Sequence, residues 1–92
     1  MVQIVATLKI MPSSPEVDLS SIQSKAEEEI KKFSGETQFK IEQEPIAFGL
    51  KALKIIFVMD ENKGSTDVLE ENIKKIDGVN SVEVIDVRRA IG

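Results

Sequence analysis

The stretch EPIAFGLKALKIIFVM, residues 44–59, decides the fold of this chain. Its second half, from Lys51 onward, is the most apolar run in the sequence and is rich in β-branched residues, which favours a buried central strand. Its first half places a proline, a glycine and large apolar side chains at the turn before that strand. Apolar residues in a turn usually fill the core. The alternative is an exposed apolar knob that a partner requires, and the stretch alone leaves both interpretations open.

The length and hydrophobicity of the chain predict one small domain, residues 1–92. A hydrophobic fraction of 41% in 92 residues is enough for a single core of modest size. No apolar run approaches the roughly 18–20 residues that a membrane span requires, and the N-terminus lacks the pattern of a signal peptide. We therefore expect a cytoplasmic, monomeric domain with no membrane partner.

The residue types that are missing exclude several classes of function. The chain has no Cys, so it has no disulfide, no iron–sulfur cluster and no thiolate nucleophile. It has no His, which is the commonest general base and a frequent metal ligand. A net charge of −4 and only four aromatic residues, all Phe, are unfavourable for binding nucleic acid. We expect no cofactor, no metal and no nucleic-acid partner.

The apolar pattern predicts three further strands and two helices. Alternating apolar residues mark strands at residues 2–11, 37–42 and 81–87. Asp18 is suited to cap the start of one helix, and a second helix is expected over about 66–76. The inner faces of the two helices would be formed by Leu19, Ile22, Ala26, Ile30 and Phe33 and by Leu69, Ile73 and Ile76.

The resulting order, β-α-β-β-α-β, predicts an α+β ferredoxin-like sandwich. It would consist of a four-stranded antiparallel sheet with two helices on one face and with the first and third strands in the middle. Only a turn separates the second and third strands, so they should form a hairpin with Pro45 at its end. This fold carries many unrelated functions and does not settle the activity.

No arrangement of residues indicates catalysis. The carboxylates lie on predicted helix faces and in turns, where solvation explains them, and none forms a convincing acid–base pair. The five Gly stand singly, without the spacing of a phosphate-binding loop. The loop at residues 11–15 lacks the Arg and Gly that acylphosphatases of this architecture use. We therefore do not expect an enzyme.

Protein binding is the function that remains. Three segments could serve it: the turn at residues 45–50, the loop at 11–15 and the C-terminal residues 86–89. Arg88 and Arg89 are equally well explained as a solvated strand end. From the expected topology we place the turn and these two arginines at one end of the sheet, and the loop at residues 11–15 at the other end.

Several segments resemble a known family. The block at residues 44–53, the acidic turn Asp60-Glu61 and the closing segment at 81–89 resemble archaeal translation elongation factor 1-beta. The opening segment, residues 2–15, is also similar to the start of that family. The resemblance covers nearly the whole chain, and the Pro-Ile-Ala-Phe-Gly-Leu block is its most specific part. The family has the ferredoxin-like fold that the pattern already predicts.

The resemblance implies a guanine-nucleotide exchange factor for the elongation factor 1-alpha GTPase. Such a factor binds the nucleotide-free GTPase more tightly than the GDP-bound form and thereby drives GDP out. In eukaryotic relatives the Phe of the matching block inserts near the nucleotide site of the GTPase, and a Lys near the C-terminus disturbs the magnesium site. This chain has no Lys there, and we consider Arg88 or Arg89 as its substitute. The implied contact residues are Pro45, Ile46, Phe48, Gly49, Arg88 and Arg89.

Two alternatives remain at this point, a small regulatory ligand-binding module and an acylphosphatase-like enzyme. Within the deciding stretch we expect Leu53, Ile55 and Phe57 to lie in the core. We expect Ile46 to join them and Phe48 to be exposed. A deeply buried Phe48 ring would instead favour the core-filling interpretation of the turn.

Overall fold

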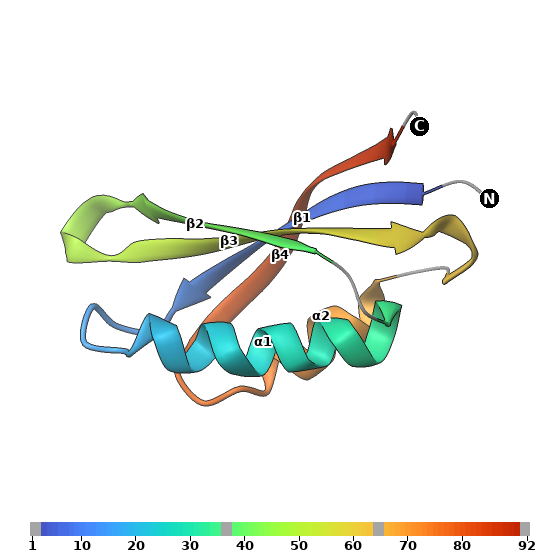
Figure 1. Cartoon of the computed structure of the whole chain (residues 1–92). Helices are drawn as coiled ribbons and strands as arrows, with labels where there is room; N and C mark the ends of the chain where they lie inside the picture. Colours follow the sequence, from blue (N-terminus) through green and yellow to red (C-terminus); the bar gives the residue numbers. More distant parts are fainter. Residues whose placement is uncertain (1–2, 36–37, 64–65, 91–92) are drawn as a thin grey trace.

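The strands and helices follow the predicted order. The computed structural model describes residues 3–35, 38–63 and 66–90. Its regular elements are β1 (Gln3–Pro12), α1 (Leu19–Ser34), β2 (Phe39–Pro45), η1 (Ala47–Gly49), β3 (Lys51–Asp60), η2 (Glu61–Lys63), α2 (Asp67–Lys74) and β4 (Val79–Ala90). The strands form one antiparallel sheet in the order β2-β3-β1-β4. Both helices lie on one face of this sheet (Figure 1), which confirms the ferredoxin-like fold.

Helix α1 begins and ends at residues with clear capping roles. The Asp18 carboxylate accepts a hydrogen bond from the Ser20 backbone N–H at 3.0 Å, which satisfies one of the free amides of the first turn. At the other end Gly35 donates its N–H to the Lys31 carbonyl at 2.8 Å. The predicted inner face is confirmed, because Ile22, Ala26 and Ile30 are buried.

The core lies between the helices and the two central strands. The predicted central residues Leu53, Ile55 and Phe57 are fully buried, as are Leu8 and Ile10 of β1. These positions alternate along their strands, so a single face of the sheet supplies them. The buried cluster comprises Ala6, Leu8, Ile10, Ile22, Ala26, Ile30, Leu53, Ile55, Phe57, Met59, Leu69 and Ile73.

The β2–β3 hairpin reaches beyond the start of α1. Figure 1 shows the hairpin turn projecting past the first turn of the helix, so no helix covers that end of the sheet. Pro45 lies at the last paired position of β2, opposite Lys51, as predicted for a residue without an N–H donor. The fold thus leaves the turn between these strands open to solvent.

Candidate functional site

The hairpin turn is held in place by its own backbone. The Ile46 N–H donates to the Leu50 carbonyl at 2.7 Å, and the Leu50 N–H donates to the Ala47 carbonyl at 3.4 Å. Between these bonds, Phe48 has φ 64° and ψ 28°, and Gly49 follows with φ 76°. The turn therefore carries two consecutive residues in the left-handed region, one of which is not glycine.

Phe48 is exposed at a cost to the fold. Its side chain is 93% exposed, and a left-handed conformation costs a residue with a Cβ roughly 1–2 kcal/mol. Neither the turn's hydrogen bonds nor the core uses the aromatic ring. The exposure that we predicted for Phe48 is confirmed, and the core-filling interpretation of this residue is wrong. Strained residues that the fold itself does not require are commonly found at functional sites.

Our expectation that Ile46 belongs to the core is wrong. The side chain is partly exposed, and it is not among the residues packed against the core cluster. The reason is the projecting hairpin, since no helix lies beneath this part of the sheet (Figure 1). Pro45 and Gly49, the other predicted contact residues of the turn, are also exposed.

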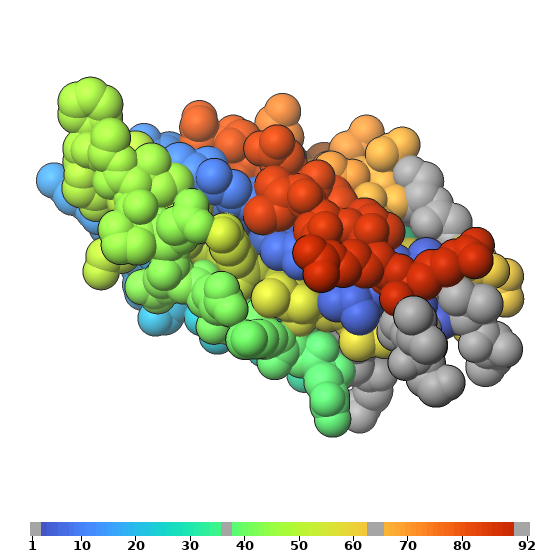
Figure 2. Space-filling view, turned by 90° about the horizontal axis from the view of Figure 1, so that it is seen from above, coloured from blue at the N-terminus to red at the C-terminus, as the bar shows by residue number. Residues whose placement is uncertain are grey.

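Our prediction that Phe48 and the two C-terminal arginines share one end of the sheet is also wrong. The register pairs Ile10 with Leu53, so the end of β1 lies beside the start of β3 and beside the turn. The same antiparallel logic pairs Gln3 with Ala90, which places Arg88 and Arg89 at the opposite end. Figure 2 shows the yellow-green hairpin turn and the red end of β4 at opposite ends of the molecule.

The arginines there form exposed ion pairs. Arg88 Nε lies 2.9 Å from an Asp86 carboxylate oxygen, and Arg89 contacts Glu61 at 3.5 Å. Both guanidinium groups are about three-quarters exposed. Exposed pairs of this kind contribute little to stability, about 0–1 kcal/mol, so both cations remain accessible to another anionic partner.

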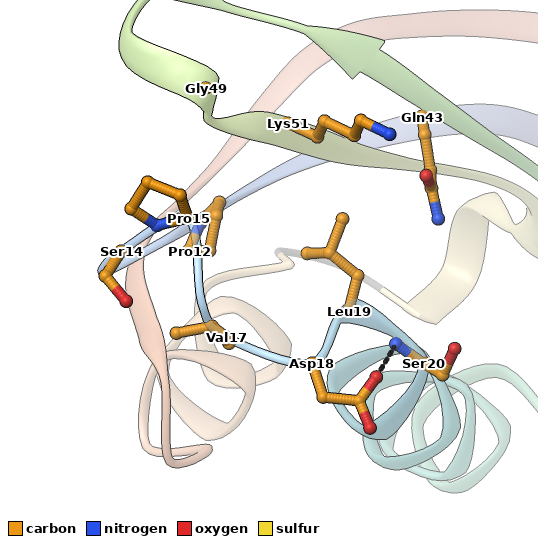
Figure 3. A pocket seen from close by; sticks show the side chains of 10 residues that line it. All are labelled: Pro12, Ser14, Pro15, Val17, Asp18, Leu19, Ser20, Gln43, Gly49 and Lys51. Atoms are coloured by element: carbon orange, nitrogen blue, oxygen red, sulfur yellow. Dashed lines mark hydrogen bonds between the residues drawn. The ribbon is translucent and has the colours of Figure 1, made fainter.

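The loop at residues 11–15 borders the turn, contrary to our expectation. Beneath the hairpin, between it and the start of α1, lies a hollow of about 320 Å³ that we call the hairpin slot (Figure 3). Two residues of the slot, Gln43 and Lys51, were missed from the sequence. A signal was present, because both occupy positions that face the helix side of their strands yet are polar. The slot is lined by Pro12, Ser14, Pro15, Val17, Asp18, Leu19, Ser20, Gln43, Gly49 and Lys51.

The opposite face of the hairpin carries an ion pair between Lys54 and Glu44. The hydrogen bond from Lys54 and its positive charge lower the pKa of Glu44 from its ordinary value of 4.5. The same hydrogen bond raises the pKa of Lys54 above 10.5. The two residues lie diagonally across the strand pair, since Glu44 is opposite Ala52 and Lys54 is opposite Glu42, so their ion pair supports the register of the hairpin that carries Phe48.

These shifts predict a small acid-sensitive contribution to stability. A carboxylate with a lowered folded-state pKa stabilises the fold above pH 4.5, and this contribution is lost as the pH falls through the folded-state pKa. We expect Glu44→Gln to flatten the decline in stability below about pH 4.5, measured by urea denaturation. Glu28→Gln, which changes an exposed carboxylate on α1, should keep the decline of the wild-type chain. If the stability of Glu44→Gln declined below pH 4.5 as steeply as that of the wild-type chain, the ion pair would not contribute to stability.

The described residues do not point to a metal or membrane site. Within residues 3–35, 38–63 and 66–90, no group of three or more acidic residues is placed to hold a metal ion. Neither of the two described helices has the length and apolar character that crossing a membrane requires. The fold and the turn define the class of protein: a small α+β sandwich that presents a hydrogen-bonded turn with an exposed aromatic side chain at one end of the sheet.

Comparisons with known proteins narrow this class. Residues 5–90 match the family described as the EF-1 guanine nucleotide exchange domain. The chain is 45% identical to elongation factor 1-beta of Methanothermobacter thermautotrophicus over 86 residues, which cover 94% of each chain. It is 47% identical to elongation factor 1-beta of Methanobrevibacter smithii over 88 residues, covering 95% of this chain and 96% of the relative. The solved structure of the de novo designed protein Foldit4 superposes with a TM-score of 0.62 over 98% of both chains, at 21% identity. This last likeness concerns the fold alone.

The chain belongs to the EF-1 guanine nucleotide exchange domain family, and its relatives are archaeal elongation factors 1-beta. Its role is nucleotide exchange in translation. The family resemblance inferred from the sequence is confirmed. The ligand-binding and acylphosphatase-like alternatives are thereby set aside.

Proposed function

We propose that residues 1–92 act as one exchange domain that promotes release of GDP from the elongation factor 1-alpha GTPase. The family supports nucleotide exchange in translation, and the GTPase partner is what the resemblance to elongation factor 1-beta implies. The domain would make and break no covalent bond. Its effect would come entirely from binding the nucleotide-free GTPase more tightly than the GDP-bound form.

The observation that carries this proposal is the exposed Phe48. An aromatic ring 93% exposed on a strained but well-bonded turn is a preformed contact point. Buried aromatic anchors supply a large share of the binding energy in protein interfaces, and a rigid turn avoids the entropic cost of ordering a loop on binding. Pro45, Ile46 and Gly49 flank Phe48 along the turn and would complete its contact with the GTPase.

Arg88 and Arg89 would form a second, separate contact. Strand β3 alone, at about 3.3 Å per residue, separates their end of the sheet from the turn by roughly 30 Å. The longest dimension of the molecule is 42 Å, so a partner that meets both ends must extend along most of its length. A guanidinium at the far end could then approach the magnesium and phosphate region while Phe48 binds elsewhere on the GTPase.

The separation of the two ends makes their contributions independent. We expect the Arg88→Ala and Arg89→Ala double replacement to slow GDP release by about tenfold, because a charged contact is lost. Combined with Phe48→Ala, the effects should multiply, since sites farther apart than about 10 Å add in free energy. Stopped-flow release of a fluorescent GDP analogue measures this. Effects that do not multiply would show that both ends act on one element of the GTPase.

The proposal is tested by comparing two affinities. Titration calorimetry should give a lower Kd for nucleotide-free elongation factor 1-alpha than for its GDP-bound form. By linkage the ratio must equal the factor by which the domain weakens GDP binding. Lys25→Gln, which changes an exposed lysine of α1, is the control and should not alter this ratio. Equal affinities for the two forms would refute the proposal, because the domain could then shift no nucleotide equilibrium.

A further inference from the structure

The hairpin slot has two unlike sides. Gln43 pairs with Leu53 across the hairpin, and Lys51 lies two residues before Leu53 on β3, so both face the helix layer. Farther along the sheet this face is apolar and covered by helices, but here it projects past α1. Figure 3 shows the Lys51 and Gln43 side chains extending over the slot above Leu19. The hairpin side therefore offers hydrogen-bond donors, one of them charged.

The lower side of the slot combines apolar residues with the polar residues Ser14, Asp18 and Ser20. Pro12, Pro15 and Leu19 form its wall and floor. Asp18 also lines the slot, but its carboxylate accepts the Ser20 N–H at 3.0 Å, and Figure 3 shows it turned away from Lys51. The carboxylate of the slot thus serves the helix cap and does not neutralise the lysine.

Lys51 differs in this respect from its neighbour Lys54. Lys54 is paired with Glu44 on the opposite face of the sheet. Among the ion pairs found within residues 3–35, 38–63 and 66–90, none includes Lys51. The Lys51 side chain is exposed. In a chain with a net charge of −4, the Lys51 ammonium at the rim of the slot thus forms no ion pair with any residue that the structure describes.

The slot is continuous with the Phe48 turn. Gly49 lines the slot and directly follows Phe48, and a Cβ placed on Gly49 would lie 3.9 Å from the Pro15 Cβ. The loop that contains Pro15 therefore supports the turn from below. Phe48 is therefore the direct chain neighbour of a residue that lines the slot.

We propose that the hairpin slot receives a carboxylate side chain of the same GTPase that meets Phe48. Lys51 Nζ binds the carboxylate, and the Gln43 amide donates a second hydrogen bond. The aliphatic part of the incoming Asp or Glu packs on Leu19 and the two prolines. Charge-assisted bonds of this type are stronger than neutral ones, and they would fix the orientation of the turn on its partner. This inference rests on the proposed function.

The test is the salt dependence of binding to nucleotide-free elongation factor 1-alpha. At low salt we expect Lys51→Gln to raise the Kd by about tenfold and Lys51→Glu by about a hundredfold, through loss and then reversal of the charge contact. Near 1 M salt, where the Debye length is about 3 Å, the difference between wild type and Lys51→Gln should largely disappear. Lys25→Gln is the matched control, since Lys25 is exposed and also in none of the ion pairs of the described residues.

The outcomes separate this inference from the proposed function. A wild-type chain that does not bind the GTPase would overturn the proposed function itself. If the wild type binds, Phe48→Ala binds more weakly and Lys51→Glu binds as the wild type does, only the proposed carboxylate contact in the slot would be refuted. A loss in Lys51→Gln that persists undiminished at high salt would also overturn it, because the contact would not be an ion pair. Thermal unfolding of each variant checks that the fold is intact.

Discussion

Replacing Phe48 with asparagine is expected to slow the stimulated release of GDP by about a hundredfold or more without weakening the fold. The loss corresponds to about 2.7 kcal/mol, the range of a central aromatic contact in an interface. The free energy of unfolding should stay the same or rise by up to about 1 kcal/mol, because asparagine tolerates the left-handed conformation that strains phenylalanine. Stopped-flow exchange kinetics and urea denaturation measure the two effects.

A loss of exchange activity without a loss of stability distinguishes a residue that contacts the partner from one that the fold requires. When a core residue is replaced, the protein loses stability, and its activity falls as a consequence. Val68→Asn provides the control, because Val68 is another large apolar residue with a 62% exposed side chain, but it lies on α2. It should leave GDP release unchanged. Full exchange activity in Phe48→Asn would show that the aromatic ring is not needed for GDP release.

The second large effect is expected at Gly78, which connects α2 to β4. Its φ of +93° disfavours any residue with a Cβ, and an added Cβ would lie only 2.8 Å from Val17 Cγ1. We expect Gly78→Ala to lower the free energy of unfolding by about 2–5 kcal/mol, combining about 1–2 kcal/mol of backbone strain with about 1–3 kcal/mol of overpacking. Urea denaturation measures the loss.

Gly35→Ala separates the two causes of that loss. Gly35 has a similar φ of +78°, but no atom lies within 4 Å of an added Cβ. Only the backbone cost should remain, about 1–3 kcal/mol, because the Gly35 conformation of φ 78° and ψ −164° is essentially restricted to glycine. If both variants lost the same stability, the contact with Val17 would not matter. The loop that contains Val17 also lines the hairpin slot, so the extra loss in Gly78→Ala reports how firmly that loop is held.

The fold could be predicted from the sequence because several independent signals agree. The alternation of Leu53, Ile55 and Phe57 identified the buried face of the central strand, and all three are fully buried. Asp18 marked the start of α1, where its carboxylate accepts a backbone N–H. Pro45 marked the end of β2, where a missing N–H is tolerated. Each signal reflects a local requirement of the chain.

The arrangement of the candidate site could be predicted only in part. Alternation shows which face of a strand is buried, but it does not show which strand ends lie together. The antiparallel pairing of β1 with both β3 and β4 decides that, and it places Arg88 and Arg89 far from Phe48. For the same reason the loop at residues 11–15 lies beside the turn. We predicted this sheet correctly but derived the wrong strand ends from it. Ile46 was misplaced because the pattern does not show how far the helix extends beneath the hairpin.

The last strand is also longer than its pattern indicates. We predicted residues 81–87, whereas β4 runs from Val79 to Ala90. The pairing with β1 shifts register between Thr7 and Leu8, where Asp86 and Val84 are their partners, so Ile85 is an extra residue in a bulge. The bulge breaks the strict alternation of apolar residues. Ile85 in the bulge and Val87, which pairs with Ala6 beyond it, are both exposed.

We propose that this chain expels GDP from elongation factor 1-alpha through the Phe48 turn. The most direct measurement is the rate at which the GTPase, loaded with a fluorescent GDP analogue, releases it into excess unlabelled nucleotide. The wild-type chain should accelerate release in proportion to its concentration until the GTPase is saturated, and Phe48→Asn should require far more protein for the same rate. A release rate that the wild-type chain leaves unchanged would contradict the account.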